Sequence, residues 1–308
     1  MLSKPNHYLS LFIHNIMYDI CCIGHITSDK VVTTNSVTHM AGGTAWYFSN
    51  ALSKLDVSYL LVTVLGASEM HYVTALRDRG IEVNVQPSAH TVYFENIYAQ
   101  NQDERSQNVL AKADPFTISQ IQSVKSRIFH LGPLLADDIS TELIKTLAAK
   151  GRVSLDVQGY LRKVENCKVY ATDWPDKIEA LRFIDILKAD EAELQALTGQ
   201  KEPSEGAKMV AGWGVKEVVV TNGSQGSVIY SDGVFYTIPA YSPQRIVDAT
   251  GCGDTYMAGY LYRRIKGANI QQAGEFAAAM AGLKTASSGP FIGTDKDVMQ
   301  FLASKFDQ

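Results

Sequence analysis

The sequence predicts an α/β protein with a mostly parallel central sheet, helices on both of its faces, and a small second sheet. Short apolar runs rich in β-forming residues alternate with helical stretches over most of the 308 residues. Most of these runs are continuously hydrophobic, which is typical of parallel strands covered on both faces. A content of 46% hydrophobic residues is sufficient for a large core. No linker divides the chain, so we expect one domain over residues 17–308.

The elements of the central sheet follow in order along the chain. Strands are predicted at 19–24, 59–65, 128–131, 153–157, 184–187 and 218–221. Helices are predicted at 45–55, 70–79 and 140–149, and later from Asp254 and over 274–285. The helix at 70–79 is followed by Gly80, a residue type that often terminates helices.

Two segments differ from these buried runs. Residues 30–39 alternate Thr, Val, Asn and Ser, and residues 92–100 have the pattern of a two-faced strand. We expect both to belong to a small antiparallel sheet that stands off the main domain. Such a sheet beside an α/β crevice can serve as a lid, and its exposed edge could pair with a second copy in a homodimer.

Composition excludes several classes of function. The net charge is −4 with acids and bases interspersed, whereas a nucleic-acid-binding protein usually carries a basic stripe. The apolar runs are far shorter than the ~20 residues that cross a bilayer, and the four cysteines lack metal-ligand spacing. We therefore expect a cytoplasmic protein with reduced thiols and no nucleic-acid or membrane partner. Residues 1–16 have no cleavage-site pattern and are interpreted as an N-terminal extension.

The segment 247–260 carries the most specific chemistry. Gly251, Cys252 and Gly253 are small residues just before a predicted helix, so their backbone N–H groups can converge at its N-terminus. Such a nest suits the negative charge of a transferring phosphoryl group. Asp254 at its mouth can accept the proton of an attacking hydroxyl. An Asp at a helix start also often serves simply as a cap, and the two roles are compatible.

This segment, Asp248-Ala-Thr-Gly-Cys-Gly-Asp254, resembles the C-terminal motif Asp-Thr-x-Gly-Ala-Gly-Asp of the phosphofructokinase-B type, or ribokinase-like, carbohydrate kinases. Ala249 and Cys252 depart from the motif. Both are small, and only the backbone N–H of Cys252 is needed, so the nest is expected to survive.

The resemblance extends over residues 18–293 and implies a ribokinase-like three-layer sandwich that uses ATP and Mg²⁺. It implies that Asp254 is the catalytic base and that the anion hole consists of Gly251, Cys252 and Gly253. Some members of the family bind a monovalent cation near the nest, and this sequence leaves that possibility open.

On the nucleotide side, the strand at 218–221 leads into Thr-x-Gly-x-x-Gly. Asn222-Gly223 is also a hairpin signal between this strand and residues 227–230, and glycines permit close approach of a ligand to the backbone. The segment is similar to a family element beside the ATP phosphates. The resemblance therefore implies nucleotide contacts from Thr221, Gly223 and Gly226.

Asp190 and Glu193 match the family element Asn-x-x-Glu, with Asp190 in place of Asn. Carboxylates at positions i and i+3 of a helix start face the same side and can hold hydrated Mg²⁺ beside phosphates. The alternative is an acidic first helical turn, which is favourable in itself. We expect Glu193 to be the metal ligand and Asp190 to contact the cofactor.

Substrate contacts are expected near the N-terminus. Asp29 follows the first strand, where α/β sheets bind ligands, and the resemblance implies that it receives hydroxyls of the acceptor; a solvated loop carboxylate is the alternative. Gly42 and Gly43 resemble the family's Gly-Gly motif, and Trp46 and Tyr47 replace the usual Asn nearby. We expect Tyr47 to contact the substrate, with core packing as the alternative.

Two further segments, around Arg105 and around Gln158 and Arg162, look closest to the inositol kinase branch. The three side chains are candidates for substrate or phosphate contacts, although both arginines are also consistent with solvated surface charges. The expected function is ATP-dependent phosphorylation of a small sugar or polyol, with an inositol-like acceptor first. A nucleoside kinase and a non-catalytic small-molecule sensor of the same fold are the alternatives.

Overall fold

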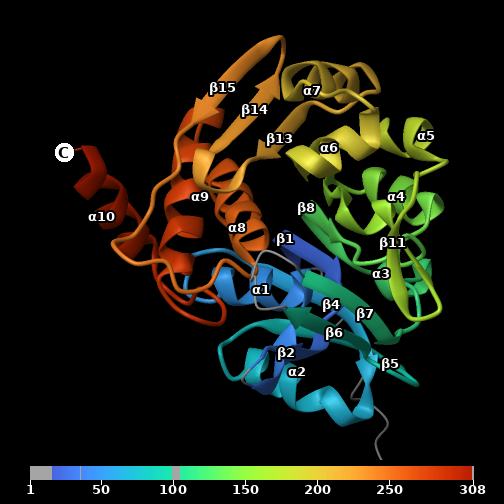
Figure 1. Cartoon of the computed structure of the whole chain (residues 1–308). Coiled ribbons are helices and arrows are strands. Elements are labelled where there is room, and N and C mark those ends of the chain that lie inside the picture. Colours follow the sequence, from blue (N-terminus) through green and yellow to red (C-terminus); the bar gives the residue numbers. More distant parts are fainter. Residues whose placement is uncertain (1–15, 35, 99–104, 307–308) are drawn as a thin grey trace, which may run out of the picture.

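The computed structural model describes residues 16–34, 36–98 and 105–306 (Figure 1). The proposed N-terminal extension, apart from Ile16, lies outside these residues. Within the described ranges, no helix combines the length and the hydrophobicity needed to cross a bilayer.

The central sheet has the strand order β15-β14-β13-β12-β9-β8-β1-β4-β5. Neighbouring strands from β13 to β5 are parallel, and β14 and β15 extend the sheet antiparallel. The six strands predicted for this sheet are confirmed, and the strands at 82–88 and 234–238 were not predicted. The bounds are β1 Met17–Gly24, β4 Tyr59–Gly66, β5 Glu82–Ser88, β8 Lys125–Gly132, β9 Arg152–Asp156, β12 Ile186–Asp190, β13 Glu217–Thr221, β14 Ser227–Ser231 and β15 Val234–Ile238.

The sheet lies between two layers of helices, as predicted. Strand β1 shows why its sequence is continuously hydrophobic: Ile20 and Cys22 pack into one core, and Cys21 and Ile23 pack into the other. One face is covered by α1 Gly43–Leu52, α2 Met70–Arg77, α8 Cys252–Ile265 and α9 Ile270–Thr285, with α10 Asp295–Phe306 packed on α9. The other face is covered by α3 Ile118–Ile121, α4 Thr141–Ala148, α5 Lys177–Leu181, α6 Glu191–Thr198 and α7 Pro203–Gly212.

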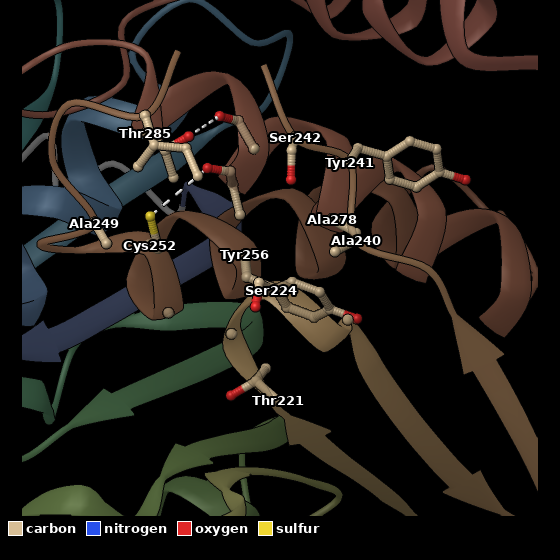
Figure 2. Close-up of a pocket in the computed structure, with 16 residues that line it drawn as sticks. Thr221, Ser224, Ala240, Tyr241, Ser242, Ala249, Cys252, Tyr256, Ala278 and Thr285 are labelled. Atoms are coloured by element: carbon tan, nitrogen blue, oxygen red, sulfur yellow. Dashed lines mark hydrogen bonds between the residues drawn. The ribbon is translucent and has the colours of Figure 1, made fainter. Parts of the chain in front are cut away.

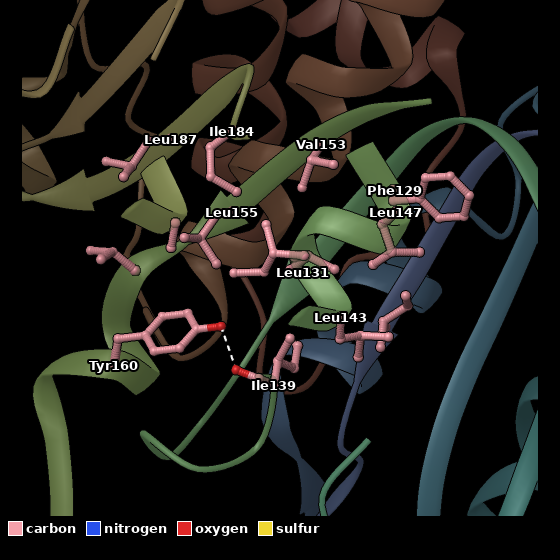
Figure 3. Close-up of a cluster of buried hydrophobic side chains, with 14 of the residues drawn as sticks. Phe129, Leu131, Ile139, Leu143, Leu147, Val153, Leu155, Tyr160, Ile184 and Leu187 are labelled. Atoms are coloured by element: carbon pink, nitrogen blue, oxygen red, sulfur yellow. Dashed lines mark hydrogen bonds between the residues drawn. The ribbon is translucent and has the colours of Figure 1, made fainter. Parts of the chain in front are cut away.

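The core on the face covered by α3 to α7 also fixes the chain beyond β9 (Figure 3). Leu143 and Leu147 of α4 pack in this core with Leu155 of β9. Tyr160, in the 3₁₀ turn η2 Val157–Leu161, donates its hydroxyl to the carbonyl of Ile139 at 2.7 Å. This turn therefore has a fixed position at the carboxyl end of β9, where ligands of parallel sheets bind.

The smaller sheet has the order β10-β11-β7-β6-β2-β3. Two expectations about it are wrong: residues 30–39 belong to two strands rather than one, and β2 pairs with β6 in parallel, so the sheet is mixed. The alternation of polar and apolar residues identifies a two-faced strand, but the direction of pairing depends on distant segments. The bounds are β2 Thr27–Val32, β3 Val37–Gly42, β6 Val92–Tyr98, β7 Arg105–Ala111, β10 Arg162–Glu165 and β11 Lys168–Ala171.

Candidate active site

The predicted anion hole lies at the start of α8. Gly251 has φ 75°, in the left-handed region, and a Cβ placed there would lie 2.2 Å from the ring of Tyr47. Both the conformation and the close contact therefore require glycine. The N–H of Cys252 donates to the carbonyl of Ala249 at 3.2 Å, so this predicted donor takes part in a turn. The N–H of Gly253 belongs to the first helical turn, where backbone donors have no intrahelical acceptor.

Asp254 is the third residue of α8 and does not cap the helix. No side chain caps α8, and the hydroxyl of Thr255 instead donates to the carbonyl of Gly251 at 2.8 Å. The carboxyl of Asp254 is hydrogen-bonded to Thr44. Burial raises the pKa of Asp254 to about 7, and the nearby carboxylate of Asp156 adds to this effect. A carboxyl with this pKa is well suited to accept a proton near neutral pH.

A buried lysine lies next to Asp254. The Nζ of Lys188 is 3.0 Å from Oδ2 of Asp156 and 3.6 Å from Oε2 of Glu193. A Cβ at Gly253 would lie 3.3 Å from this Nζ, so the ammonium lies directly against the start of α8. Burial alone would lower the pKa of Lys188, but the two carboxylates outweigh it and the net pKa is raised. The lysine is therefore a permanent positive charge beside the candidate base.

Lys188, Asp156 and Thr44 were not among the residues predicted for the site. A signal for Lys188 was present, because a lysine inside the apolar strand β12 is unusual and buried lysines are almost always paired. Asp156 is the last residue of β9, at the carboxyl edge of the sheet, and was equally visible.

A cavity of about 310 Å³ adjoins the start of α8 (Figure 2). The predicted nucleotide contacts Thr221, Gly223 and Gly226 line it together with Cys252 and Gly253. Figure 2 shows that Thr221 of β13 and Ser224 of the β13–β14 connection line one side of the cavity. Cys252 and Tyr256 come from α8, and Ala278 and Thr285 come from α9. The structure therefore brings the two predicted phosphate-side elements to one cavity.

The start of α1 connects the central sheet to the smaller sheet. A Cβ at Gly42 would lie 2.3 Å from Oδ2 of Asp29, and one at Gly43 would lie 2.5 Å from the carbonyl oxygen of His25. The glycine pair thus allows α1 to begin directly against β2. Asp29 is a residue of β2, not of a loop after β1 as expected, and its Oδ1 accepts a 2.6 Å hydrogen bond from Thr27.

Comparison with known proteins identifies the family of the chain. The model of the pfkB family carbohydrate kinases matches residues 13–297. The chain belongs to this family. The kinase is a phosphotransferase with a hydroxyl group as acceptor, in a family whose matched members act on sugars or nucleosides.

The matched relatives differ in their substrates. A cytidine kinase of Thermococcus kodakarensis is 26% identical over 83% of this chain and 92% of its own length. An inositol 3-kinase of Arabidopsis thaliana is 26% identical over 82% of this chain and 70% of its own. A solved pyrophosphate-dependent kinase of the ribokinase family, complexed with a pyrophosphate analog and myo-inositol, is 29% identical with a TM-score of 0.81 and covers 91% of this chain and 99% of its own. The predicted ribokinase-like fold is confirmed.

In the kinase, Glu193, the predicted metal ligand, and Asp190, the predicted cofactor contact, form a capping box at the start of α6. The N–H of Asp190 donates to Oε2 of Glu193 at 2.8 Å, and the N–H of Glu193 donates to Oδ1 of Asp190 at 2.7 Å. The favourable helix start that the sequence left as an alternative is therefore present. Among the described residues no three His, Cys, Asp or Glu side chains form a metal cluster. The remaining oxygen of Glu193 fits an ion held mainly by water and phosphates, and its role as ligand stays a prediction.

The β13–β14 connection confirms the predicted hairpin but not a tight Asn-Gly turn. The N–H of Asn222 donates to the carbonyl of Gly226 at 2.8 Å, and the 3₁₀ turn η3 Gly223–Gln225 lies between them. Gly226 has φ 97°, and a Cβ there would lie 2.2 Å from the carbonyl oxygen of Ile238. These glycines therefore shape the wall of the cavity.

The aromatic pair after the glycines is in the core of the kinase. Tyr47 exposes 2% of its surface and packs against Gly251, and Trp46 exposes 9% and lies beside Tyr72. Core packing, the alternative left open by the sequence, is therefore the observed role of Tyr47. Its ring packs against Gly251, a residue of the predicted anion hole.

The other substrate candidates lie in η2 and at the first positions of two strands of the smaller sheet. Gln158 is in η2, and its N–H donates to Oδ1 of Asp156 at 3.2 Å. Arg162 begins β10 of the smaller sheet, and its carbonyl accepts from the N–H of Ala136 at 3.1 Å. Arg105 begins β7, and its side chain lies outside the described residues. Their contacts with a substrate stay predictions.

Proposed function

We propose that the protein transfers the γ-phosphoryl group of ATP to a hydroxyl of a small sugar or polyol. An inositol-like polyol is the first candidate acceptor. The observation that supports this most strongly is the position of Asp254. Its carboxyl has a pKa of about 7 and belongs to the first turn of the helix whose N-terminus borders the cavity. A base, a positive charge and helix N-terminal donors are the groups that phosphoryl transfer requires.

In the proposed mechanism, Asp254 accepts the proton of the acceptor hydroxyl as its oxygen attacks the γ-phosphorus. The bond from phosphorus to the bridging oxygen of ATP breaks, and ADP leaves. Backbone donors around Gly253 and the ammonium of Lys188 stabilise the charge on the transferring group. Mg²⁺, held beside Glu193, would neutralise the phosphate oxygens. The smaller sheet acts as a lid that excludes water and prevents hydrolysis of ATP.

A nucleotide donor is supported by the cavity beyond the anion hole. Its wall there includes the apolar or small residues Ala240, Ile246 and Ala278, which suit an uncharged ring better than a highly charged anion. Pyrophosphate is the second candidate donor, because the similar inositol-bound kinase is pyrophosphate-dependent. Pyrophosphate would occupy only the part of the cavity beside Cys252 and Gly253.

An inositol-like acceptor is supported by Asp29 and by two of the relatives. Asp29 lies against the Gly42 backbone at the entry to α1, where one carboxylate oxygen accepts a hydrogen bond from Thr27 and the other lies beside Gly42. The same solved kinase contains myo-inositol, and an inositol 3-kinase is among the curated relatives. The cytidine kinase makes a nucleoside the second candidate acceptor.

The test is a matrix of donors against acceptors, with product formation followed directly. ATP and pyrophosphate are each combined with inositols, ketoses, aldoses, sugar acids and nucleosides. We expect turnover with ATP and a polyol, and its loss in Asp254→Asn. Asp173→Asn is the matched control, because Asp173 is a surface residue paired with Lys177. If ligands bind saturably but no pair of donor and acceptor gives turnover, the proposal is contradicted and a non-catalytic small-molecule sensor is favoured.

A further inference from the structure

A second buried lysine lies close to the anion hole and is not used by the mechanism above. Lys284 is in the last turn of α9 and exposes 1% of its surface. Its Nζ donates to the carbonyl oxygen of Asp248 at 2.8 Å and to Oδ2 of the same residue at 2.9 Å. A fully buried ammonium is costly to desolvate, so its position indicates a specific role rather than chance packing.

The partner of Lys284 begins the segment that leads into the anion hole. Asp248 is held by its backbone as well, because its N–H and that of Val247 donate to the carbonyl of Thr285 at 3.2 and 2.7 Å. The other carboxylate oxygen of Asp248 accepts the N–H of Thr250 at 2.9 Å. One carboxylate thus joins the Lys284 ammonium to the residue immediately before Gly251.

The ammonium of Lys284 also lies near the Tyr47 ring, which in turn contacts Gly251. The Nζ of Lys284 lies 5.9 Å from the centre of the Tyr47 ring, on which Gly251 packs. Burial would raise the pKa of Asp248, but the hydrogen bonds from Lys284 and Thr250 outweigh it and the pKa is lowered. The carboxylate is therefore charged at neutral pH and needs a cation beside it.

We propose that Lys284 is a positioning residue for phosphoryl transfer, whose ammonium serves as a built-in monovalent cation that fixes the segment 248–251. This inference rests on the proposed function. It means that the wild-type kinase turns over without an added monovalent cation. Removal of the ammonium leaves a carbonyl, a carboxylate and an aromatic face around a small buried space, and these groups attract hard monovalent cations.

The experiment compares wild type, Lys284→Met and Lys266→Met. Lys266 is the matched control, because it pairs with Asp56 on the surface at the other end of α8. Turnover is measured by direct detection of the phosphorylated product, with tetramethylammonium as the only monovalent cation, and then with ammonium or potassium added. Wild type and Lys266→Met are expected to be insensitive to the cation. Lys284→Met is expected to lose turnover about 10²-fold, the typical effect of a misplaced catalytic group, and to regain most of it with ammonium.

If Lys284 merely stabilised the fold, ammonium would restore the turnover of Lys284→Met only by raising the melting temperature of the variant. Recovery of turnover at an unchanged melting temperature therefore distinguishes the positioning role. Wild-type dependence on added potassium, unchanged turnover of Lys284→Met, or a folded Lys284→Met that no cation restores would each overturn the proposal. Asp248→Asn keeps Lys284 and tests the same link: it should lose turnover without rescue by ammonium. Where wild type phosphorylates no acceptor, the proposed function fails, and pyrophosphate binding by calorimetry with the same variants and cations then tests the role of Lys284.

Discussion

The ammonium of Lys188 lies 3.0 Å from the carboxylate of Asp156, and this ion pair adjoins Gly253 at the start of α8. Asp156 ends β9, and Lys188 is its register partner in the neighbouring parallel strand β12, so the sheet itself sets their distance. Burial is the main reason that the pKa of Asp254 is raised, and within this pair Asp156 raises the pKa further while Lys188 lowers it, so the pair adjusts the proton affinity of the candidate base.

Lys188→Met should therefore reduce turnover and shift its pH dependence. The variant removes one positive charge that has two roles. It lowers the pKa of Asp254, and in the proposed mechanism it stabilises the transferring phosphoryl group. We expect kcat to fall by about 10²–10³-fold, as for loss of one electrostatic contact in the transition state. The acidic limb of kcat/KM should move to higher pH. Lys216→Met, on the surface beside Asp185, is the control, and an unshifted limb in the Lys188 variant would argue against this coupling.

The pH profile of the wild-type kinase tests the base directly. Asp254 must be deprotonated to accept the proton of the acceptor hydroxyl, and its pKa is raised to about 7. We therefore expect kcat/KM to fall about tenfold per pH unit below that value. A profile that stays flat down to pH 5 would exclude Asp254 as the essential base.

The same pKa shift predicts a conflict between activity and stability. In the folded chain Asp254 keeps its proton up to about pH 7, whereas in the unfolded chain it ionises with the ordinary aspartate pKa of 3.8. The free energy of unfolding contributed by this group is thus greatest below pH 3.8 and declines between these two values. Asp254→Asn should therefore lose turnover yet be more stable than wild type at pH 8, with little difference at pH 4. Urea unfolding at both pH values measures this, and lower stability of the variant at pH 8 would contradict the shift.

Much of the fold was visible in the sequence because local patterns determine it. The buried strands β1 and β13 were predicted from apolar runs, and the start of α8 was predicted from two glycines before Asp254. The mixed pairing in the smaller sheet was not predicted, because the paired strands β2 and β6 lie over 60 residues apart along the chain.

For the site, sequence patterns showed which segments carry the chemistry but not which side chains face each other. Tyr47 was predicted to face the substrate, and only its packing on Gly251 places it in the core. Glu193 could be predicted as acidic and close to phosphate, but its bond to the N–H of Asp190 depends on where α6 begins. The ion pairs of Lys188 with Asp156 and of Lys284 with Asp248 join segments far apart in the sequence, so a single sequence can signal a buried lysine but does not identify its partner.

Gly251→Ala should damage the predicted anion hole for two separable reasons. Gly251 has φ 75°, and an added methyl group would also overlap the ring of Tyr47. Gly267 provides the control, because it has φ 86° but a Cβ added there would meet nothing within 4 Å. Both substitutions should cost stability by about 1–3 kcal/mol from backbone strain, measured by thermal or urea unfolding. Only Gly251→Ala should also lose turnover, and equal loss in both variants would show that the contact with Tyr47 is not essential.

Ala278→Leu tests whether the cavity receives the base of a nucleotide. Ala278 exposes 7% of its surface and lines the cavity from α9, where added methyl groups would occupy space beyond the anion hole. The KM for ATP should rise about tenfold, equivalent to about 1.4 kcal/mol of lost binding, whereas kcat at saturation should change little. Ala303→Leu, on an exposed face of α10, is the matched control. Inorganic pyrophosphate provides the deciding comparison, because it has no base to displace. A kinase that uses pyrophosphate as its donor would be indifferent to Ala278→Leu, and equal KM values for ATP in the variant and wild type would place the nucleotide elsewhere.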